Sequence, residues 1–357
     1  MKVATHASPP PDESTPGSDL LGNILRDVSR SFYLTLRVLP AAVRRPIGLG
    51  YLLARATDTI ADTDLLPVSE RLQALAQLRA RILGEVQSPL DLSRLVSAQT
   101  GAGTLTGSVA ERELLQRTES AVGLLETLNA FERERVREVL KTITSGQILD
   151  LTRFGAASSA QPVALANQAE LDDYTYRVAG CVGEFWTRIC RSNLFPNHPV
   201  SEVRLVAEGI RYGQGLQWVN ILRDLPKDLR QGRCYLPADR LAEVGLKPTD
   251  LLDPSVEPKL RPLYHQLLDS AEAHLDAGWR YTCSLPSNQR RLRLGCAWPV
   301  LIGWQTTARL RVTNVLDATQ RVKISRADVR KILLSTLWRL PFPAAWTRLP
   351  RRFRATE

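Results

Sequence analysis

The chain has 357 residues, of which 44% are hydrophobic and 24% are charged, and its mean hydropathy is −0.16. This composition excludes disordered, collagenous and fibrous proteins, and the length allows one large or two medium domains with a sizeable core. The formal net charge of +10 favours an anionic partner, which on charge alone is a nucleic acid, a phospholipid or a phosphorylated small molecule.

Residues 1–17 are predicted to form a disordered leader, because Pro, Ser and Asp are frequent and no apolar signal-peptide core is present. The five cysteines include no C-x-x-C pair, so they predict neither a disulfide framework nor a zinc ribbon. The sequence contains no uninterrupted run of 18 apolar residues, so it predicts no membrane-spanning helix. We therefore expect a cytoplasmic protein, with contact at the inner face of a membrane left open.

Apolar residues recur at helical spacing from Ser18, a candidate N-cap, onward. Pro46 suits the first turn of a buried helix that ends at Asp62. Between residues 87 and 107, Gly, Ser and Thr break the periodicity and predict a loop with room for one short helix. Further helices are expected at about 69–86, 108–153, 167–193, 199–229, 256–285, 288–317 and 325–340.

Apolar and polar residues do not alternate with a period of two between turn signals anywhere in the sequence, so no strand is predicted. About nine helices joined mostly by short loops indicate one all-α domain over residues 18–337. The Gly- and Pro-containing stretch 230–254 is expected to be a loop over one end of this bundle.

Two pairs of aspartates have the same spacing on two different predicted helices. Asp58 and Asp62 lie in RATDTIAD, and Asp224 and Asp228 lie in NILRDLPKD. A spacing of four puts both carboxylates on one helix face, where they repel each other unless a cation is near. A single pair is most simply interpreted as a solvated helix end. Because a second pair with the same spacing also follows an arginine, we expect both pairs to form one site.

Four carboxylates facing one another across a bundle would suit Mg²⁺, which binds a few carboxylates together with substrate phosphates and water. Arg55 and Arg223 each stand close to one pair and suit bidentate contact with phosphate oxygens. Around such a site, an apolar helical interior predicts a substrate with a diphosphate head and a hydrocarbon tail, as in prenyl diphosphates.

Several strings, in order along the chain, resemble those of the squalene and phytoene synthases, which condense two prenyl diphosphates head to head. The resemblance covers about residues 23–335 and rests on SRSF (29–32), YLLARATDTIAD (51–62), YTYRVAGCVG (174–183), QWVNILRDLPKD (217–228) and RCYLP (233–237). It implies an isoprenoid-synthase-type helical bundle around a central apolar cavity, most like that of bacterial squalene synthases.

The resemblance also implies roles for individual residues. By the resemblance, the Mg²⁺ ligands are Asp58, Asp62, Asn220, Asp224 and Asp228. The residues that it assigns to binding the diphosphate and the neighbouring part of the substrate are Ser29, Arg30, Ser31, Phe32, Tyr51, Arg55, Gln217 and Arg223. Val178, Ala179 and Gly180 match small residues that let a hydrocarbon tail approach the helix backbone, and Tyr174 matches a tyrosine that assists ionisation and accepts or relays a proton.

Pro226 departs from a strict pattern, because it falls between Asp224 and Asp228. A proline inside a helix removes a hydrogen bond and kinks or ends the helix. The sequence therefore leaves the placement of Asp228 open: a new turn at Pro226 would re-aim it, and the segment with Arg230 and Arg233 would help to cover the diphosphate.

The segment RVKISR (321–326) resembles a stretch of squalene synthases that is associated with NADPH, so Lys323 and Arg326 are candidate cofactor contacts. The expected reaction is the Mg²⁺-dependent condensation of two farnesyl diphosphates through presqualene diphosphate to squalene, with NADPH as reductant. A solvated surface is the simpler interpretation of these two cations. A phytoene, dehydrosqualene or hydroxysqualene synthase without NADPH is the alternative within the family.

From another class, the net charge leaves a basic helical scaffold or nucleic-acid-binding protein as an alternative. Outside the C-terminal segment, however, basic and acidic residues are interspersed, and no helix-turn-helix or zinc-finger pattern occurs. The sequence therefore favours the enzyme and predicts no nucleic-acid partner.

Residues 338–357 form a basic, aromatic tail with five Arg against one Glu. Trp338, Phe342, Trp346 and Phe353 are interspersed with these charges, a combination that suits a lipid interface. Three prolines interrupt any helix here, so we expect peripheral membrane contact, and a disordered tail is the alternative.

Overall fold

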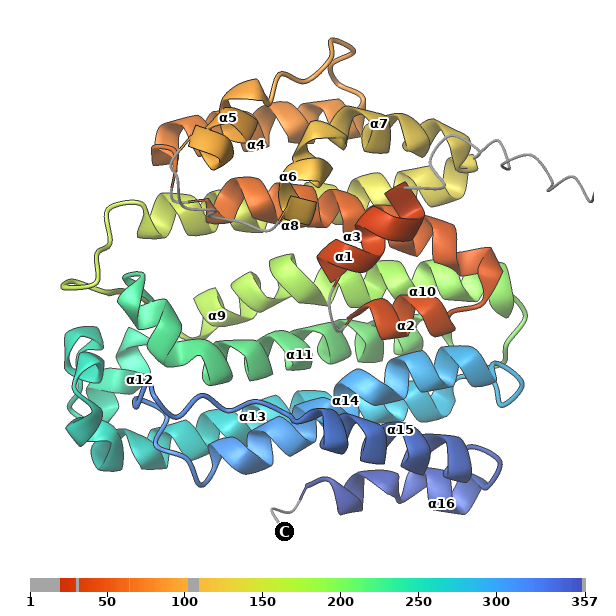
Figure 1. The fold of residues 1–357 in the computed structure, drawn as a ribbon. Helices are drawn as coiled ribbons and strands as arrows, with labels where there is room; N and C mark the ends of the chain where they lie inside the picture. Colours follow the sequence, from red (N-terminus) through yellow and green to blue (C-terminus); the bar gives the residue numbers. More distant parts are fainter. Residues whose placement is uncertain (1–19, 30–31, 64, 102–108, 355–357) are drawn as a thin grey trace, which may run out of the picture.

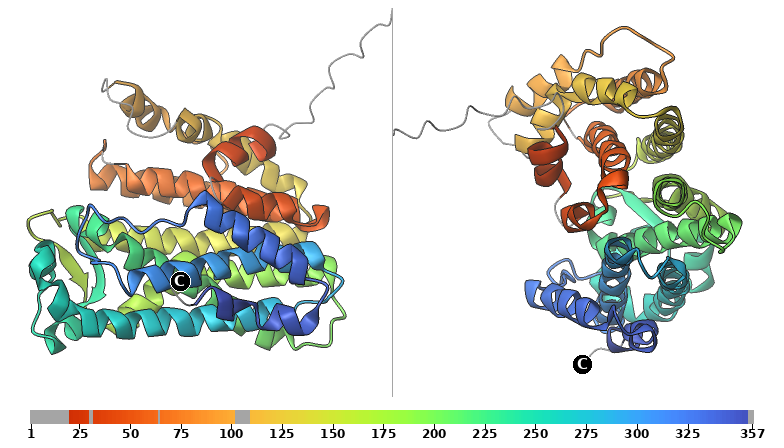
Figure 2. Two further views of the ribbon diagram at one scale, coloured as in Figure 1. Left: turned by 60° about the horizontal axis from the view of Figure 1, so that its bottom comes forward. Right: turned by 90° about the vertical axis from the view of Figure 1, so that its right-hand side faces the viewer.

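The computed structural model describes residues 20–29, 32–63, 65–101 and 109–354, so the predicted leader and Ser18 lie outside the described residues. The described chain is a bundle of helices stacked in layers, shown from three sides in Figures 1 and 2. The predicted all-α class is confirmed. None of the described helices is both long and apolar enough to cross a membrane.

The first half of the chain supplies the upper layers of Figure 1. Its α-helices are α1 (Leu25–Ser29), α2 (Phe32–Val38), α3 (Ala41–Asp62), α4 (Val68–Leu83), α5 (Ser93–Gly101), α6 (Val109–Gln116), α7 (Thr118–Gly123) and α8 (Ala130–Phe154). The predicted helix over 108–153 is thus divided in three. The last of these helices starts where the Asn129 side chain accepts a hydrogen bond from the Glu132 amide at 2.9 Å, a typical N-cap.

The second half supplies the lower layers. Its α-helices are α9 (Gln168–Thr175), α10 (Cys181–Leu194), α11 (Glu202–Arg230), α12 (Ala238–Glu243), α13 (Glu257–Ser284), α14 (Arg290–Leu310), α15 (Arg326–Arg339) and α16 (Pro343–Thr347). A π-helical turn, η3 (Tyr176–Gly180), joins α9 to α10. Short π or 3₁₀ turns complete the described elements: η1 (Leu20–Ile24), η2 (Leu124–Thr127), η4 (Pro248–Leu252), η5 (Pro254–Val256) and η6 (Leu349–Arg352).

Two short strands were not predicted. The strands β1 (Val163–Leu165) and β2 (Arg233–Pro237) pair in parallel, with Val163 opposite Arg233. Strands of three and five residues are too short to show a clear alternation of side chains. The stretch 230–254 therefore contains a strand and helical turns, and its strand holds two side chains of the candidate site.

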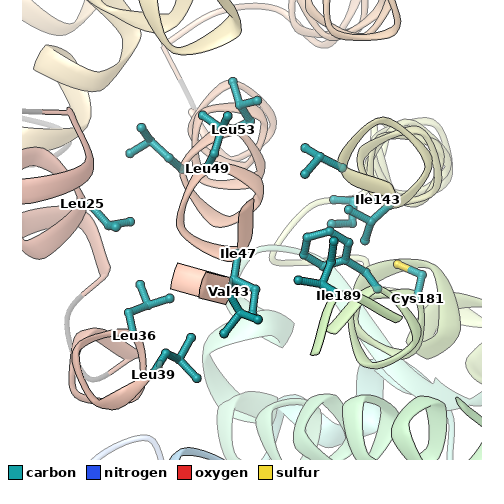
Figure 3. Packing of buried hydrophobic residues seen from close by; sticks show 14 of the residues in the cluster. Leu25, Leu36, Leu39, Val43, Ile47, Leu49, Leu53, Ile143, Cys181 and Ile189 are labelled. Atoms are coloured by element: carbon teal, nitrogen blue, oxygen red, sulfur yellow. The ribbon is translucent and has the colours of Figure 1, made fainter. Parts of the chain in front are cut away.

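Buried side chains fix α3 on two sides, as Figure 3 shows. Leu25 and Leu36 approach from α1 and α2, whereas Ile143 and Ile189 approach from α8 and α10. The facing Val43 on α3 is fully buried. Close packing of this kind resists rotation of the helix, so the direction of the aspartates on its last turn is set by the core.

The helix α11 continues through Pro226 to Arg230, close to the helix expected over 199–229, so Pro226 does not end it. Because proline has no N–H, the carbonyl of Leu222 loses its normal intrahelical donor. The buried Tyr264 of α13 donates its hydroxyl to that carbonyl at 2.8 Å. This bond replaces the missing one, and Asp224 and Asp228 stay on one helix.

The predicted tail is folded onto the bundle rather than free. Trp346 and Phe353 are buried, and the Trp346 ring stacks on Trp279 with a centroid distance of 5.3 Å. By contrast, Trp338 at the end of α15 and Phe342 after it are exposed. Only two of the four aromatic residues of the tail are therefore available for an outside partner in this conformation.

The Tyr264 hydroxyl is expected to stabilise α11 only because residue 226 is a proline. Tyr264→Phe should lower the free energy of unfolding by about 1–2 kcal/mol, since it leaves a buried carbonyl without a donor. In a Pro226→Ala background the new backbone N–H can bond to Leu222, so the same substitution should cost clearly less. Urea denaturation of the four proteins of this cycle measures the difference, and an equal cost in both backgrounds would contradict the account.

Candidate active site

Two adjoining cavities, of about 220 and 500 Å³, open among α3, α8, α9, α11 and β2. They share wall residues Asp62, Tyr174, Gln217, Arg233 and Tyr235. Asp58 lines the smaller cavity, and Asp224 and Asp228 line the larger one. The structure thus brings the two aspartate pairs, which are more than 160 residues apart in sequence, to one cleft.

On the α3 side, Asp58 accepts a hydrogen bond of 2.5 Å from the Gln147 amide and lies 3.7 Å from the Arg55 guanidinium. The cleft walls displace bulk water, and the charge of Asp62 is near, so the pKa of Asp58 rises to about 6. Gln147 on α8 was not predicted, because it is 89 residues from Asp58 in the chain and belongs to no motif. It helps to hold the aspartate in place.

On the α11 side, Asp224 accepts a hydrogen bond of 3.0 Å from the neighbouring Arg223. Burial and the charge of Asp224 raise the pKa of Asp228 to about 7. The Asn220 amide donates to Gln217 at 3.3 Å, which leaves the Asn220 carbonyl oxygen as an acceptor. Both carboxylates and this oxygen line the larger cavity.

The donor atoms of the cleft suit Mg²⁺, which prefers oxygen ligands. Carboxylate and amide oxygens dominate, and the Gln147 carbonyl oxygen is buried with no hydrogen-bond partner among the described residues. Among the residues that the structure describes, no group of three or more His, Cys, Asp or Glu side chains could hold a metal ion by itself. Each ion would therefore take further oxygens from a phosphate-bearing ligand and water, as Mg²⁺ commonly does.

A fifth carboxylate of the cleft, Asp150 on α8, was missed from the sequence. Arg233 of β2 lies 3.6 Å from Asp150 and 3.8 Å from Asp62, and the Tyr235 hydroxyl donates to Asp150 at 3.0 Å. Burial raises the pKa of Asp150 to about 6, and these two partners oppose the rise. Asp150 has no acidic residue one turn away on its helix, so spacing gave no signal for it.

Tyr174 on α9 lines both cavities, as a catalytic residue would. Its ring stacks on Tyr235 with centroids 4.7 Å apart, and only 7% of the residue is exposed. Burial and the nearby Asp150 charge raise the pKa of Tyr174 above its usual value. Tyr174 is therefore a neutral phenol near pH 7, able to donate or relay a proton but not to act as a phenolate.

Arg55 also lines the larger cavity, and its guanidinium forms an ion pair with Glu111 of α6. Glu111 is buried and was not predicted, because α6 follows an irregular stretch far from α3 in sequence. The pair orients Arg55 while Asp58 approaches from the next turn. Arg223 and Lys227 add two more cations to the same walls.

The SRSF string contributes less to the described cleft than expected. The Ser29 hydroxyl is buried and donates to the Leu25 carbonyl at 2.5 Å, within its own helix. Arg30 and Ser31 lie outside the described residues, and for Phe32 the description covers only the backbone at the start of α2. Tyr51 packs against the apolar core, and neither it nor Ser29 is among the described wall residues of the two cavities.

The small residues after Tyr174 serve close helix packing, and their expected contact with a hydrocarbon tail stays a prediction. Val178 lines the smaller cavity, but Ala179 and Gly180 face α11. A Cβ on Gly213 of α11 would lie 2.1 Å from the Ala179 carbonyl oxygen, and one on Gly180 would lie 3.1 Å from Gln214. Their small size is therefore explained by close helix packing, which brings Tyr174 and α11 together.

The two candidate cofactor residues lie outside the cleft. Lys323 and Arg326 are exposed, and the Lys323 carbonyl accepts a hydrogen bond from Arg309 at 2.7 Å. A third cavity of about 260 Å³ adjoins the larger cavity and includes Arg321 and Val322 of the same segment in its walls. It shares Arg223, Asp224 and Lys227 with the larger cavity, so the RVKISR segment reaches the site through its first two residues.

The sequence matches the family model for squalene/phytoene synthase over residues 25–328. The chain therefore belongs to the squalene/phytoene synthase family. It is 29% identical over 266 residues to presqualene diphosphate synthase from Zymomonas mobilis, covering 74% of this chain and 75% of that protein. It is 26% identical over 334 residues to 15-cis-phytoene synthase from Synechocystis, covering 92% and 84%.

Other relatives are longer than this chain. A bifunctional lycopene cyclase/phytoene synthase from Leptosphaeria maculans is 30% identical over 249 residues, which are 69% of this chain but 39% of that protein. Among solved structures, TcSQS with the ligand BPH1237 has a TM-score of 0.71 at 21% identity and covers 92% of this chain and 91% of the other. A dehydrosqualene synthase has a TM-score of 0.60 at 20% identity, covering 92% and 99%. The structural matches support the fold.

The crowded carboxylates are expected to make the metal-free protein less stable as the pH rises. The folded state holds the Asp228 proton up to about pH 7, whereas the unfolded chain loses it near its ordinary value of 3.8. Its contribution to stability therefore falls between these pH values. In EDTA, Asp228→Asn should raise the melting temperature by about 2 °C or more near pH 8 and by less near pH 5.

Thermal unfolding followed by circular dichroism tests this. The control is Asp269→Asn, which removes an exposed carboxylate on α13 that pairs with Arg311 outside the cavity walls. It should give no such gain at either pH, because exposed ion pairs contribute little. An equal gain for Asp228→Asn at both pH values would show that the site is not strained by its own charge.

Proposed function

We propose that the chain condenses two farnesyl diphosphates head to head, through presqualene diphosphate to squalene, with Mg²⁺ and NADPH. The observation that carries this proposal is the single cleft in which two aspartate pairs meet Arg55, Arg223 and Arg233. A dense set of carboxylates beside cations suits a metal–diphosphate group, and the family relation makes prenyl diphosphates the expected class. The squalene end point rests on the RVKISR resemblance.

In this proposal Asp58 and Asp62 hold metal on one side of the cleft, and Asp224, Asp228 and the Asn220 oxygen hold it on the other. Bound Mg²⁺ would neutralise the diphosphate and make it a better leaving group. Arg55 and Arg223 would bind free phosphate oxygens, since guanidinium groups match their geometry. The apolar core beyond the cleft would keep water from the allylic cation.

Closing the cyclopropane ring forms one carbon–carbon bond and releases one proton from carbon. Tyr174 is placed to relay that proton, because it lines both cavities and contacts Tyr235. The Tyr235 hydroxyl in turn donates to Asp150, whose pKa of about 6 leaves it mostly ionised at neutral pH and basic enough to accept a proton. We propose Asp150 as the group that takes the proton through this pair of phenols.

NADPH, when bound, would supply the hydride that ends the second half-reaction. The third cavity supports a place for its phosphates, because Arg321, Arg230 and Lys227 line it beside the diphosphate site. Lys323 and Arg326 are exposed on the same segment and would contact the cofactor from outside that cavity. Without the reductant, the same first half-reaction would lead to presqualene diphosphate, dehydrosqualene or hydroxysqualene.

Loss of one metal-binding aspartate is expected to stop the first half-reaction. Asp58→Asn should lower presqualene diphosphate formation by about 100-fold or more, because an amide replaces a charged ligand of the metal. Mass spectrometry of products from farnesyl diphosphate and Mg²⁺ measures this, with and without NADPH, and Asp269→Asn serves as the matched control. Unchanged turnover in the Asp58 variant would disprove the site, and no turnover by the unmodified protein would call for geranylgeranyl diphosphate as the next substrate.

The cofactor assignment is expected to separate the two half-reactions. Arg321→Ala and Lys323→Ala should each leave presqualene diphosphate formation within about two-fold of the unmodified protein while reducing squalene output roughly ten-fold at limiting NADPH. Lys141→Ala, an exposed lysine on α8, is the control. An unchanged dependence on NADPH in both variants would assign the RVKISR segment to structure alone.

A further inference from the structure

Four apolar side chains near the end of α15 form an exposed patch, here called the Trp338 surface: Leu334, Leu337, Trp338 and Phe342. Their exposed fractions are 68, 52, 76 and 57%. The first three are spaced by three and four residues, so they share one helix face. The opposite face of the helix is packed on the bundle through the buried Ile332 and Thr336.

Such a patch needs explanation, because single exposed apolar residues are normal but contiguous ones mark interaction sites. Its base is rigid. Thr336 accepts a hydrogen bond of 3.0 Å from the Trp298 indole of α14, and the next segment is anchored by Trp346 under the Arg293 guanidinium. The Trp338 surface is therefore a formed feature of the fold at one edge of the bundle, where α15 and α16 lie (Figures 1 and 2).

The segment that carries the surface is almost entirely positive in charge. Residues 326–354 contain eight Lys or Arg and one Asp, and that Asp328 is bound by Arg309 and Ser325. Five arginines of this segment are exposed and form no ion pair within the described part of the chain: Arg326, Arg330, Arg348, Arg351 and Arg352. A partner that covers the apolar centre would therefore also have to supply negative charge.

We infer that the Trp338 surface docks on an anionic lipid bilayer. Trp, Leu and Phe side chains enter the boundary between headgroups and acyl chains, and arginines bind anionic headgroups. A nucleic acid would meet the arginines but would leave the Leu and Trp side chains without an apolar partner. The inference concerns binding in the absence of substrate, so it stands or falls separately from the proposed reaction.

The test uses the full chain without substrate and two kinds of vesicle, phosphatidylcholine alone and an equal mixture with phosphatidylglycerol. Sedimentation should show binding to the mixture. Leu334→Ser/Trp338→Ser should lower the partition coefficient roughly ten-fold or more, because two large apolar groups no longer insert. The matched control is Val109→Ser/Val203→Ser, which removes two exposed apolar groups on α6 and α11 and should bind like the unmodified protein.

A second variant separates charge from apolar contact. Arg348→Ala/Arg351→Ala/Arg352→Ala should lose most of its preference for phosphatidylglycerol, and added salt should have less effect on it than on the unmodified protein. Circular dichroism checks that all variants are folded. Failure of the unmodified protein to bind vesicles, or equal binding by the Leu334/Trp338 variant, would overturn the inference. So would light scattering that shows a dimer which this variant dissociates, with no vesicle binding, because a second copy would then be the partner.

Discussion

The repulsion between carboxylates in one cleft is the constraint on which the structure of the site depends. Asp58, Asp150 and Asp228 all have raised pKa values because burial and neighbouring charges oppose their ionisation. Without a bound cation, the protein must hold these groups in place by other means. It does so with apolar packing on both sides of α3 and with a continuous α11, and arginines compensate part of the charge. The same repulsion is what a metal–diphosphate group would relieve.

The continuity of α11 shows how one local defect is repaired from outside the helix. Pro226 removes a hydrogen bond in the turn that carries Asp224 and Asp228, and the Tyr264 hydroxyl of α13 supplies the missing donor. A helix that broke at this point would separate the two carboxylates. The placement of these two carboxylates on α11 therefore depends on a buried tyrosine that is not among the described wall residues of the cleft, and the stability of the core and the geometry of the site are linked through it.

Patterns within one segment were enough to predict the helices, the aspartate pairs and Tyr174, because a spacing of four or an ordered motif is visible in a short string. Gln147, Asp150 and Glu111 were missed, since each reaches the site only through tertiary packing and stands in no pattern of its own. Local reasoning could not settle the effect of Pro226 on Asp228, because the compensating hydroxyl comes from another helix. For Ala179 and Gly180, small size was correctly noticed, but sequence cannot tell a helix crossing from a ligand contact.

The C-terminal segment shows the same limit in a different form. Trp346 and Trp338 both stand among arginines and other aromatic residues in the sequence. The Trp346 ring is nevertheless buried between Trp279 and Arg293, whereas the Trp338 ring is exposed. The buried ring fixes the segment to the bundle, and this attachment makes the exposed rings a defined surface instead of a mobile tail. A rigid surface loses less conformational entropy when it meets a partner than a disordered segment does. The packing of Trp346 and Phe353 on the bundle thus holds Trp338 and Phe342 in a fixed position before a partner binds.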